Sequence, residues 1–408
     1  MSLSRVKKLE DQYLLGVYKR YDVLVDRGSG SYLIDRSNKR YLDLMAGIGV
    51  NALGYSHPRV VRLLRKQIKK PLHLSNLLYH EYQGRLAARL AGVSGLDRVF
   101  FTNSGTEAVE GCLKFARVWA NSMAGNEKTR ARRYRVLAVE GSFHGRTMGA
   151  LSATEKAKYR EPFEPLVPGF DFVGFNDLAD LETKFTEDVC AVIFETIQGE
   201  GGIRPVSEEF YRRARALTRE TGAALITDEI QCGVGRTGRW FAFHKFAAVT
   251  DYEDLPDLVS VAKPLGLGIP LGAVLMKDSV AAAIEPGTHG STFGGGPLAC
   301  RLGLELFKIF EEEGILEHVQ QVGAYFQKRL NQLTDLPVVS EVRGDGLMLA
   351  VELTTPAKPI VDELLVAGFI LNCTRENVLR ILPPLIITKK QIDKFIDSLR
   401  PMLEKIHD

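Results

Sequence analysis

Residues 207–229 read SEEFYRRARALTRETGAALITDE. The first part has the apolar spacing of an amphipathic helix, with Ser207 placed to cap its N-terminus and Gly222 placed to end it. The last part, AALITDE, is a short and nearly continuous apolar run, which is typical of a strand buried on both faces. A helix that leads directly into a buried strand favours an α/β fold.

The same alternation of strands and helices extends from about residue 97 onward. Further strands are expected at RVFFTN (98–103), YRVLAVE (134–140), VCAVIFE (189–195) and DLVSVA (257–262). A helix is expected over 105–121. Apolar strands separated by helices predict a mostly parallel sheet with helices on both faces.

The pattern divides the chain into a large and a small part. We expect a large domain over residues 58–297, built on the parallel sheet. A smaller α/β domain is expected to combine an N-terminal segment, 1–57, with residues 298–408, where a long helix precedes a strand–helix–strand–helix series. In the N-terminal segment, alternating apolar positions predict a β-hairpin over 31–44 that turns at Arg36–Lys39.

Composition and charge exclude several classes of protein. The 408 residues include 53 basic and 50 acidic side chains, so a net charge of +3 gives no case for nucleic-acid binding. The basic run TRARRYR (129–135) is typical of a solvated surface segment. No apolar stretch approaches the ~20 residues of a membrane span, and the start of the chain lacks the apolar core of a signal peptide. The five cysteines are scattered and the eight histidines lack metal-ligand spacing, which predicts a cytoplasmic protein without a metal site.

In open parallel sheets, ligands bind at the carboxyl ends of the strands, so the residues that follow each strand are candidates. After the first strand, TNSGTEAVE (102–110) places Ser104, Gly105 and Thr106 at the start of a helix. Backbone N–H groups, the helix dipole and two hydroxyls suit a phosphate group. A plain helix cap explains the same residues equally well.

Charged residues also stand at the ends of two later strands. Asp228 ends AALITD, and a buried carboxylate there needs a partner such as a protonated ring nitrogen, with Gln231 placed to reach a neighbouring oxygen. Taken singly, a strand-end acid that caps the following loop is the commoner outcome. Lys263 follows DLVSVA in an apolar, glycine-rich run, where it is either a lysine that snorkels to water or one buried for its chemistry.

The segment SFHGRT (142–147) adds an aromatic ring and a cation. Phe143 offers a flat surface for stacking, and Arg146 offers a fork for a carboxylate. His144 has a secondary role, since a loop histidine is more often satisfied by its surroundings than catalytic.

The remaining strand-end segments supply carboxylates and a second arginine. Glu195 and Glu200 border a glycine-rich loop, although a flexible loop without function explains them singly. Arg380 stands among apolar residues in NVLRILPPL, which indicates a paired guanidinium. HGSTFGGGPLAC (289–300) is another hydroxyl- and glycine-rich turn before a helix. Together these segments supply the parts of a pyridoxal phosphate (PLP) site, namely a Schiff-base lysine, an acid for the ring nitrogen and clamps for carboxylates.

A series of motifs appears in order along nearly the whole chain: GVNALGYSHPRV (49–60), FFTNSGTEA (100–108), SFHGRT (142–147), IQGEGG (197–202), DEIQCGVGRTG (228–238), the Lys263 segment, HGSTFGG (289–295) and LRILPPLIIT (379–388). This ordered set resembles the class III aminotransferases of fold type I. Within that class, LHLSNLLYHEYQ (72–83) and EVRGDGLMLAVEL (341–353) make the chain most similar to the acetylornithine aminotransferases.

The resemblance implies the fold type I architecture and PLP as the cofactor. The contacts with PLP that it implies are a covalent bond from Lys263, pairing of Asp228 with the ring nitrogen, Gln231 on the phenolic oxygen, Phe143 on the ring face, support from His144 and Glu195, and phosphate binding by Ser104, Gly105 and Thr106. Thr292 is implied to reach the phosphate from the partner subunit, so the resemblance implies a homodimer with shared active sites.

The resemblance also implies the substrates and the residues that bind them. The terminal amine of N2-acetyl-L-ornithine would pass to 2-oxoglutarate, giving N-acetylglutamate semialdehyde and glutamate in arginine biosynthesis, with Lys263 moving the proton. Arg146 would hold a substrate carboxylate, with Ser291 near the acetylornithine end. Arg380 would take the α-carboxylate of glutamate, and Glu200 would neutralise Arg380 when the other substrate is bound.

Departures from the family pattern leave alternatives open. Leu74 and Tyr82 stand where a threonine and a proline are common, in a segment expected near the substrate. The donor could therefore be succinylornithine, ornithine, a carrier-linked acetyl-lysine or 4-aminobutyrate. An aminomutase of the glutamate-semialdehyde type shares the fold and the lysine chemistry, but it would not need Arg380 and Glu200.

Two further classes of protein are disfavoured. A non-catalytic protein would not need both Lys263 and Asp228, and a NAD oxidoreductase is disfavoured because no G-x-G-x-x-G follows the first strand of the sheet.

Pro264 and Leu267 replace small residues that are usual beside the lysine. The proline is expected to disfavour a helical conformation at Lys263.

Overall fold

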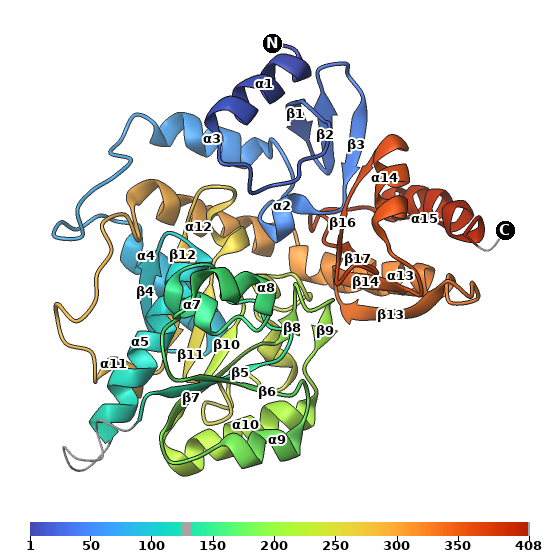
Figure 1. Ribbon diagram of the computed structural model, residues 1–408. Coiled ribbons are helices and arrows are strands. Elements are labelled where there is room, and N and C mark those ends of the chain that lie inside the picture. The colour runs from blue at the N-terminus through green and yellow to red at the C-terminus, as the bar shows by residue number, and fades with distance from the viewer. Residues whose placement is uncertain (124–132, 407–408) are drawn as a thin grey trace.

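The computed structural model describes residues 1–123 and 133–406, so residues 129–132 of the basic run TRARRYR lie outside the described residues. Its largest element is a seven-stranded sheet (Figure 1). The strands, in spatial order, are β4 (Arg98–Thr102), β12 (Gly272–Met276), β11 (Leu258–Val261), β10 (Ala224–Asp228), β7 (Val189–Glu195), β5 (Arg135–Val139) and β6 (Phe170–Val173).

The sheet is mixed but mostly parallel, as predicted. β10 runs parallel to β7 and β11, and β5 runs parallel to β7 and β6. β12 is antiparallel to both of its neighbours, β11 and β4. β12 and β6 were not predicted from the sequence, because runs of only five and four residues cannot be assigned to a strand by periodicity alone.

Helices cover both faces of this sheet, which confirms the expected α/β architecture. On one face, α5 (Gly105–Met123) packs with strand residues such as Ile193 and Ile226. On the other face lie α10 (Glu208–Thr221) and α4 (Gln83–Ser94). α10 begins and ends as expected, because the Ser207 Oγ accepts from Phe210 N at 3.1 Å and Gly222 adopts a left-handed conformation with φ of 69°.

The other helices and 3-10 turns connect these strands or belong to the chain ends. They are α1 (Leu3–Tyr13), α2 (Ala46–Gly49), α3 (Pro58–Gln67), α7 (Met148–Ser152), α8 (Ala157–Arg160), η1 (Glu161–Phe163), α9 (Leu178–Lys184), η2 (Ala242–Lys245), η3 (Lys263–Gly266), α11 (Asp278–Ala281), α12 (Pro297–Glu312), α13 (Ile315–Asn331), α14 (Lys358–Val366) and α15 (Lys389–Glu404). Within the described part of the chain, none of the helices has the length and apolar character needed to cross a membrane.

Two four-stranded sheets are formed from the chain ends. The first contains β1 (Val25–Ser29), β2 (Tyr32–Asp35), β3 (Arg40–Asp43) and β15 (Phe369–Ile370). β2 and β3 form the predicted hairpin, and β15 pairs in parallel with β3, so segments far apart in the sequence lie side by side (Figure 1).

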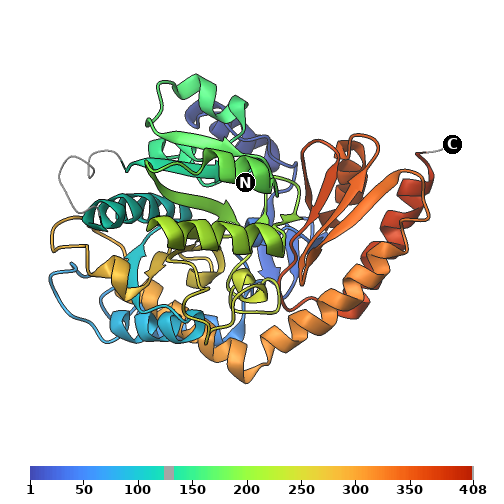
Figure 2. The same ribbon diagram turned by 90° about the horizontal axis from the view of Figure 1, so that it is seen from below.

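The second small sheet has the order β13 (Val339–Asp345), β14 (Met348–Leu353), β17 (Val378–Ile381) and β16 (Asn372–Thr374). Figure 2 shows this sheet, with α13 and α15, to one side of the large sheet. A two-stranded ladder of β8 (Ile197–Gln198) and β9 (Arg204–Pro205) lies between them, since β9 contacts β13. The C-terminal part thus contains more strands than the expected strand–helix–strand–helix series. We propose residues 58–297 as the large domain, because it holds every strand of the seven-stranded sheet.

Candidate active site

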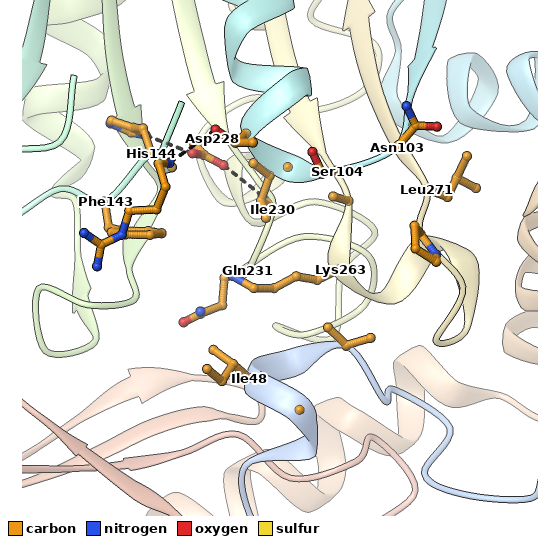
Figure 3. A pocket seen from close by; sticks show the side chains of 18 of the residues that line it. Ile48, Asn103, Ser104, Phe143, His144, Asp228, Ile230, Gln231, Lys263 and Leu271 are labelled. Carbon is orange, nitrogen blue, oxygen red and sulfur yellow. Dashed lines mark hydrogen bonds and ion pairs between the residues drawn. The ribbon is translucent and has the colours of Figure 1, made fainter. Parts of the chain in front are cut away.

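The carboxyl ends of the parallel strands border a cavity of about 570 Å³ (Figure 3). The predicted site residues that line it are Ser104, Gly105, Thr106, Phe143, His144, Arg146, Glu195, Glu200, Asp228, Gln231 and Lys263. These residues end or follow five strands that are distant in sequence. The structure therefore brings most of the predicted site together at one edge of the sheet.

Asp228 is held at the end of β10 by two contacts. His144 Nδ1 lies 2.8 Å from Asp228 Oδ2, and both side chains are buried. Ile230 N donates to Asp228 Oδ1 at 3.0 Å (Figure 3). Because the carboxylate can only accept, the Nδ1 atom of His144 carries the proton in this bond. The histidine is thus the charged or polar partner that a buried carboxylate requires.

Lys263 extends its side chain into the cavity beside Gln231 (Figure 3). Burial lowers the pKa of the Lys263 ammonium, and the nearby Arg380 adds to this effect, whereas Asp228 raises the pKa. Within residues 1–123 and 133–406, no hydrogen bond or ion pair is formed by the Lys263 ammonium. The lysine is therefore oriented into the cavity rather than consumed by a structural ion pair.

The backbone at Lys263 differs from the expectation based on Pro264. Lys263 is the first residue of the 3-10 turn η3, so the prediction that proline would disfavour a helical conformation there is wrong. Pro264 occupies the second position of the turn, where a missing N–H removes no hydrogen bond within the turn. Leu267 ends the turn in the left-handed region with φ of 51°, a conformation that favours glycine.

The loop before α5 caps the helix and also lines the cavity, so it fits both interpretations of TNSGTEAVE. Ser104 Oγ accepts from Glu107 N at 3.3 Å, and Glu107 Oε2 accepts from Asn103 N at 2.6 Å, so the helix start is capped. Gly105 and Thr106 still line the cavity at the N-terminus of the helix. The cap therefore leaves the positive end of the helix dipole facing the cavity.

The aromatic ring and the first arginine lie against each other at the side of the cavity. The Arg146 guanidinium stands 5.5 Å from the centre of the Phe143 ring and 3.7 Å from that of Tyr159. The Phe143 and Tyr159 rings meet edge to face, with centroids 6.2 Å apart. This contact places an exposed guanidinium at the cavity, and no carboxylate in the described part of the chain pairs with it.

Glu195 is a buried carboxyl in the wall of the cavity. Its two oxygens accept from Phe143 N and Gly199 N, each at 3.0 Å. Burial raises the pKa of Glu195 to about 7, an effect that the charge of Asp228 strengthens and His144 opposes. Its structural role is clear from the two backbone bonds, which connect the loop of Phe143 to the loop of Gly199.

Glu200 and Arg380 form an ion pair at the cavity wall. Arg380 Nη1 lies 2.6 Å from Glu200 Oε1, and Arg380 Nε donates to Asn372 Oδ1 at 3.2 Å. Arg380 is only 1 % exposed, which fits the paired guanidinium expected from NVLRILPPL. Burial acts to raise the pKa of Glu200, but the Arg380 charge outweighs it and holds that pKa below its usual value.

Comparison with known proteins agrees with this geometry. The family model described as aminotransferase class-III matches residues 17–403. An acetylornithine aminotransferase of Methanocaldococcus jannaschii is 42% identical over 399 residues, which cover 98% of each chain. One of Aquifex aeolicus is 43% identical over 392 residues, covering 96% of this chain and 100% of the relative. The chain belongs to the class-III aminotransferases.

A solved structure extends this similarity to the whole fold. The ornithine aminotransferase from Toxoplasma gondii superimposes with a TM-score of 0.93 at 30% identity, covering 100% of this chain and 96% of that one. The class-III aminotransferases of this group are PLP-dependent transaminases of fold type I, so this enzyme uses PLP with an amine donor and an oxo acid.

The residues in the cavity fit PLP. Gln231 Oε1 lines the cavity but is a buried acceptor without a hydrogen-bond partner among the described residues. Lys263 has no partner among the residues that the structure describes, Asp228 presents a carboxylate, and the start of α5 suits a phosphate. These groups match the amine, ring nitrogen and phosphate chemistry of the cofactor.

Three predicted site residues are not among those that line this cavity. Arg380 pairs with Glu200, which does line it. Ser291 and Thr292 line a separate cavity of about 470 Å³, together with His73 and Asn76. Ser291 Oγ nevertheless accepts from Asn103 Nδ2 at 3.2 Å, and Asn103 lines the main cavity. The side chain of Asn103 thus lines the main cavity and contacts a residue of the other cavity.

The N-terminal wall of the site was not predicted from the sequence. Gly47, Ile48 and Val50 line the cavity opposite Lys263, and Figure 3 shows Ile48 on α2 facing that lysine. Ala46 and Ile48 both have positive φ, of 48° and 61°, so α2 is a left-handed turn. Glycines in AGIG were the available signal, but they do not predict left-handed conformations at alanine and isoleucine.

Proposed function

We propose that this aminotransferase moves the terminal amine of N2-acetyl-L-ornithine to 2-oxoglutarate, giving N-acetylglutamate semialdehyde and glutamate in arginine biosynthesis. The observation that carries the proposal is the ion pair between Arg380 and Glu200, because Glu200 lines the cavity that holds Lys263. Glu200 can neutralise Arg380 and can also move away from it. This suits an enzyme that has one substrate with a carboxylate beside the reacting carbon and another substrate without one. The names of the relatives that are 42% and 43% identical support acetylornithine as the donor.

The positions of the side chains support the proposed cofactor-binding roles. In the proposal, Lys263 holds PLP covalently, Asp228 stabilises its protonated ring nitrogen with support from His144, Gln231 contacts its phenolic oxygen, Phe143 stacks on its ring, and Ser104, Gly105 and Thr106 bind its phosphate. Glu195 supports the loops that carry these groups through its two backbone bonds. When bound, PLP supplies a reactive carbonyl and an electron-withdrawing ring.

Lys263 is proposed as the proton carrier. Burial lowers the pKa of its ammonium, so more of the neutral amine is present at neutral pH than for an exposed lysine. Once the substrate's amine had displaced Lys263 from PLP, the freed neutral amine would take the proton from the substrate carbon that bears the departing amine. The resulting ammonium returns that proton in the same catalytic cycle, which leaves Lys263 unchanged overall.

The arginines are proposed to discriminate between the substrates. Arg146 holds a carboxylate of acetylornithine, with Ser291 near its acetyl end. Arg380 takes the α-carboxylate of glutamate or 2-oxoglutarate after Glu200 moves away. Glu200 returns to Arg380 when acetylornithine presents its carboxylate-free end, so a buried charge is not left without a partner.

A comparison of amines in single half-reactions tests the donor. The holoenzyme is mixed separately with acetylornithine, ornithine, succinylornithine and 4-aminobutyrate, and conversion of the cofactor to its amine form is followed by absorbance. We expect the largest kcat/KM with acetylornithine. A larger value with another amine would reject this donor while retaining the aminotransferase family. Ornithine is the most informative competitor, since it is the donor in the name of the T. gondii structure.

We further propose a cytoplasmic homodimer with shared active sites, in which Thr292 reaches the phosphate of the partner's cofactor. The position of Thr292 outside its own chain's main cavity supports this arrangement. Mixing inactive Lys263→Ala subunits with impaired Thr292→Ala subunits tests it, because a mixed dimer would contain one complete site. Activity restored by mixing supports sharing, and no gain after verified subunit exchange rejects it.

A further inference from the structure

The glycine-rich loop that carries Glu200 is held by arginines from the C-terminal sheet. The loop spans residues 199–202, between β8 and β9, and three of its four residues are glycines. Arg343 Nε donates to Gly202 O at 2.8 Å, and Arg375 Nη1 donates to Gly201 O at 3.4 Å. The C-terminal part therefore holds this loop through its backbone carbonyls as well as through the Arg380–Glu200 pair.

Arg343 makes the shorter of the two backbone contacts and is itself firmly fixed. Its Nη1 atom donates to Glu341 Oε2 at 2.6 Å and to Glu352 Oε2 at 2.5 Å, and its side chain is 10% exposed. Burial acts to raise the pKa of Glu352, but bonding to Arg343 outweighs it and lowers that pKa. A Cβ atom on Gly202 would lie 3.1 Å from Arg343 Nη2, so the guanidinium packs closely on the loop backbone.

We propose that Arg343 is a positioning residue that keeps Glu200 paired with Arg380 and so determines how readily a dicarboxylate substrate displaces Glu200. Glycines give a loop many accessible conformations, so forming the ion pair from an unrestrained loop requires additional ordering. The bond from Arg343 fixes the loop beforehand and favours the paired state. The inference rests on the proposed role of Arg380 as the site for the α-carboxylate.

Glutarate provides a direct test because it resembles 2-oxoglutarate but has no carbonyl group to react. Its affinity for the holoenzyme is measured by titration calorimetry in the wild type and in Arg343→Gln. We expect glutarate to bind about threefold to tenfold more tightly to the variant, because a less stable Arg380–Glu200 pair competes less with the ligand. Loss of a positive charge alone would weaken the binding of a dianion, so the expected sign separates positioning from electrostatics. Unchanged or weaker binding would overturn the proposal.

Control variants isolate the contact. Arg239 Nη1 reaches Asp345 of the same strand, β13, at 3.1 Å, and Arg239→Gln is expected to leave glutarate affinity unchanged. In a Glu200→Gln background, Arg343→Gln should have no further effect, because the pair that it stabilises is already lost. A persistent tightening in that background would overturn the proposal.

Two more variants keep the test decisive. If Arg343→Gln does not fold, Glu341→Gln takes its place, because loss of the Glu341 carboxylate loosens the Arg343 side chain on its exposed side. Glutarate should then bind more tightly, and no change in its affinity would overturn the inference. Arg380→Ala tests the proposed function separately. If it fails to weaken glutarate binding, the assigned role of Arg380 is wrong. If it weakens binding but Arg343→Gln has no effect, only the inference about Arg343 fails.

Discussion

Replacement of Glu200 by glutamine should make the enzyme bind dicarboxylates more tightly. The Glu200 carboxylate and the Arg380 guanidinium are 2.6 Å apart, and the side chains are 32% and 1% exposed, respectively. A hydrogen bond to a charged group contributes ~1.5–3 kcal/mol. Because solvent screens the one-third exposed carboxylate, we use the lower limit, ~1.5 kcal/mol. A ligand that must displace Glu200 loses this amount, which corresponds to about tenfold in affinity.

The measurement is the Kd of glutarate for the Glu200→Gln holoenzyme by titration calorimetry. The expected Kd is about one-tenth of the wild-type value. Glu182→Gln is the matched control, since Glu182 Oε1 lies 2.6 Å from Arg213 on the surface of the molecule. Its Kd should equal that of the wild type. An unchanged or higher Kd in Glu200→Gln would refute the competition between Glu200 and the substrate carboxylate.

Three further predictions concern the lysine, a buried acid and a glycine. Lys263→Ala should abolish covalent attachment of the cofactor, so borohydride reduction and mass spectrometry should find no adduct, and an adduct at another lysine would contradict the assignment. Burial raises the pKa of Glu229 to about 7, above its unfolded value of about 4.3. The ionised carboxylate therefore destabilises the folded state, and the free energy of unfolding rises as the pH falls from about 7 to about 4.3. The wild-type advantage over Glu229→Gln in free energy of unfolding, measured by urea titration, should grow by about 2 kcal/mol between about pH 8 and pH 5, and a constant difference would contradict this. In Gly199→Ala the new Cβ would lie 2.3 Å from Gln231 Oε1, so PLP affinity by fluorescence titration should fall about tenfold; Gly16→Ala, with nothing within 4 Å, should not change it.

The sequence predicted the positions of Asp228 and Lys263 because buried apolar strands are easily identified and their carboxyl ends meet at one sheet edge. It did not predict the left-handed conformation of Ala46 and Ile48, which depends on surrounding packing rather than on local preference. The partner of Asp228 was equally inaccessible. His144 is distant in sequence and has the polarity of an ordinary loop residue, so only the assembled sheet brings the two side chains to 2.8 Å.

The family motifs were needed for the substrate side of the site. Arg380 could be recognised as a paired guanidinium because it stands among apolar residues, but the residue pattern alone did not name Glu200 as its partner. Glu200 lies in the loop between β8 and β9, whereas Arg380 lies in β17 of the C-terminal sheet, and their contact depends on how the C-terminal part packs against the large sheet. Local sequence patterns carry little information about contacts between elements that are distant in the sequence.

The exchange of carboxylates at Arg380 also bears on the reactivity of Lys263. Burial lowers the pKa of Lys263, the positive charge of Arg380 lowers it further, and the charge of Glu200 raises it. In the proposed cycle Arg380 always has one carboxylate partner, either Glu200 or the α-carboxylate of the substrate. The charge near Lys263 is therefore similar in both half-reactions, because one carboxylate replaces the other. One lysine can then take up and return protons in both half-reactions at the same pH, although the two substrates differ by a carboxylate beside the reacting carbon.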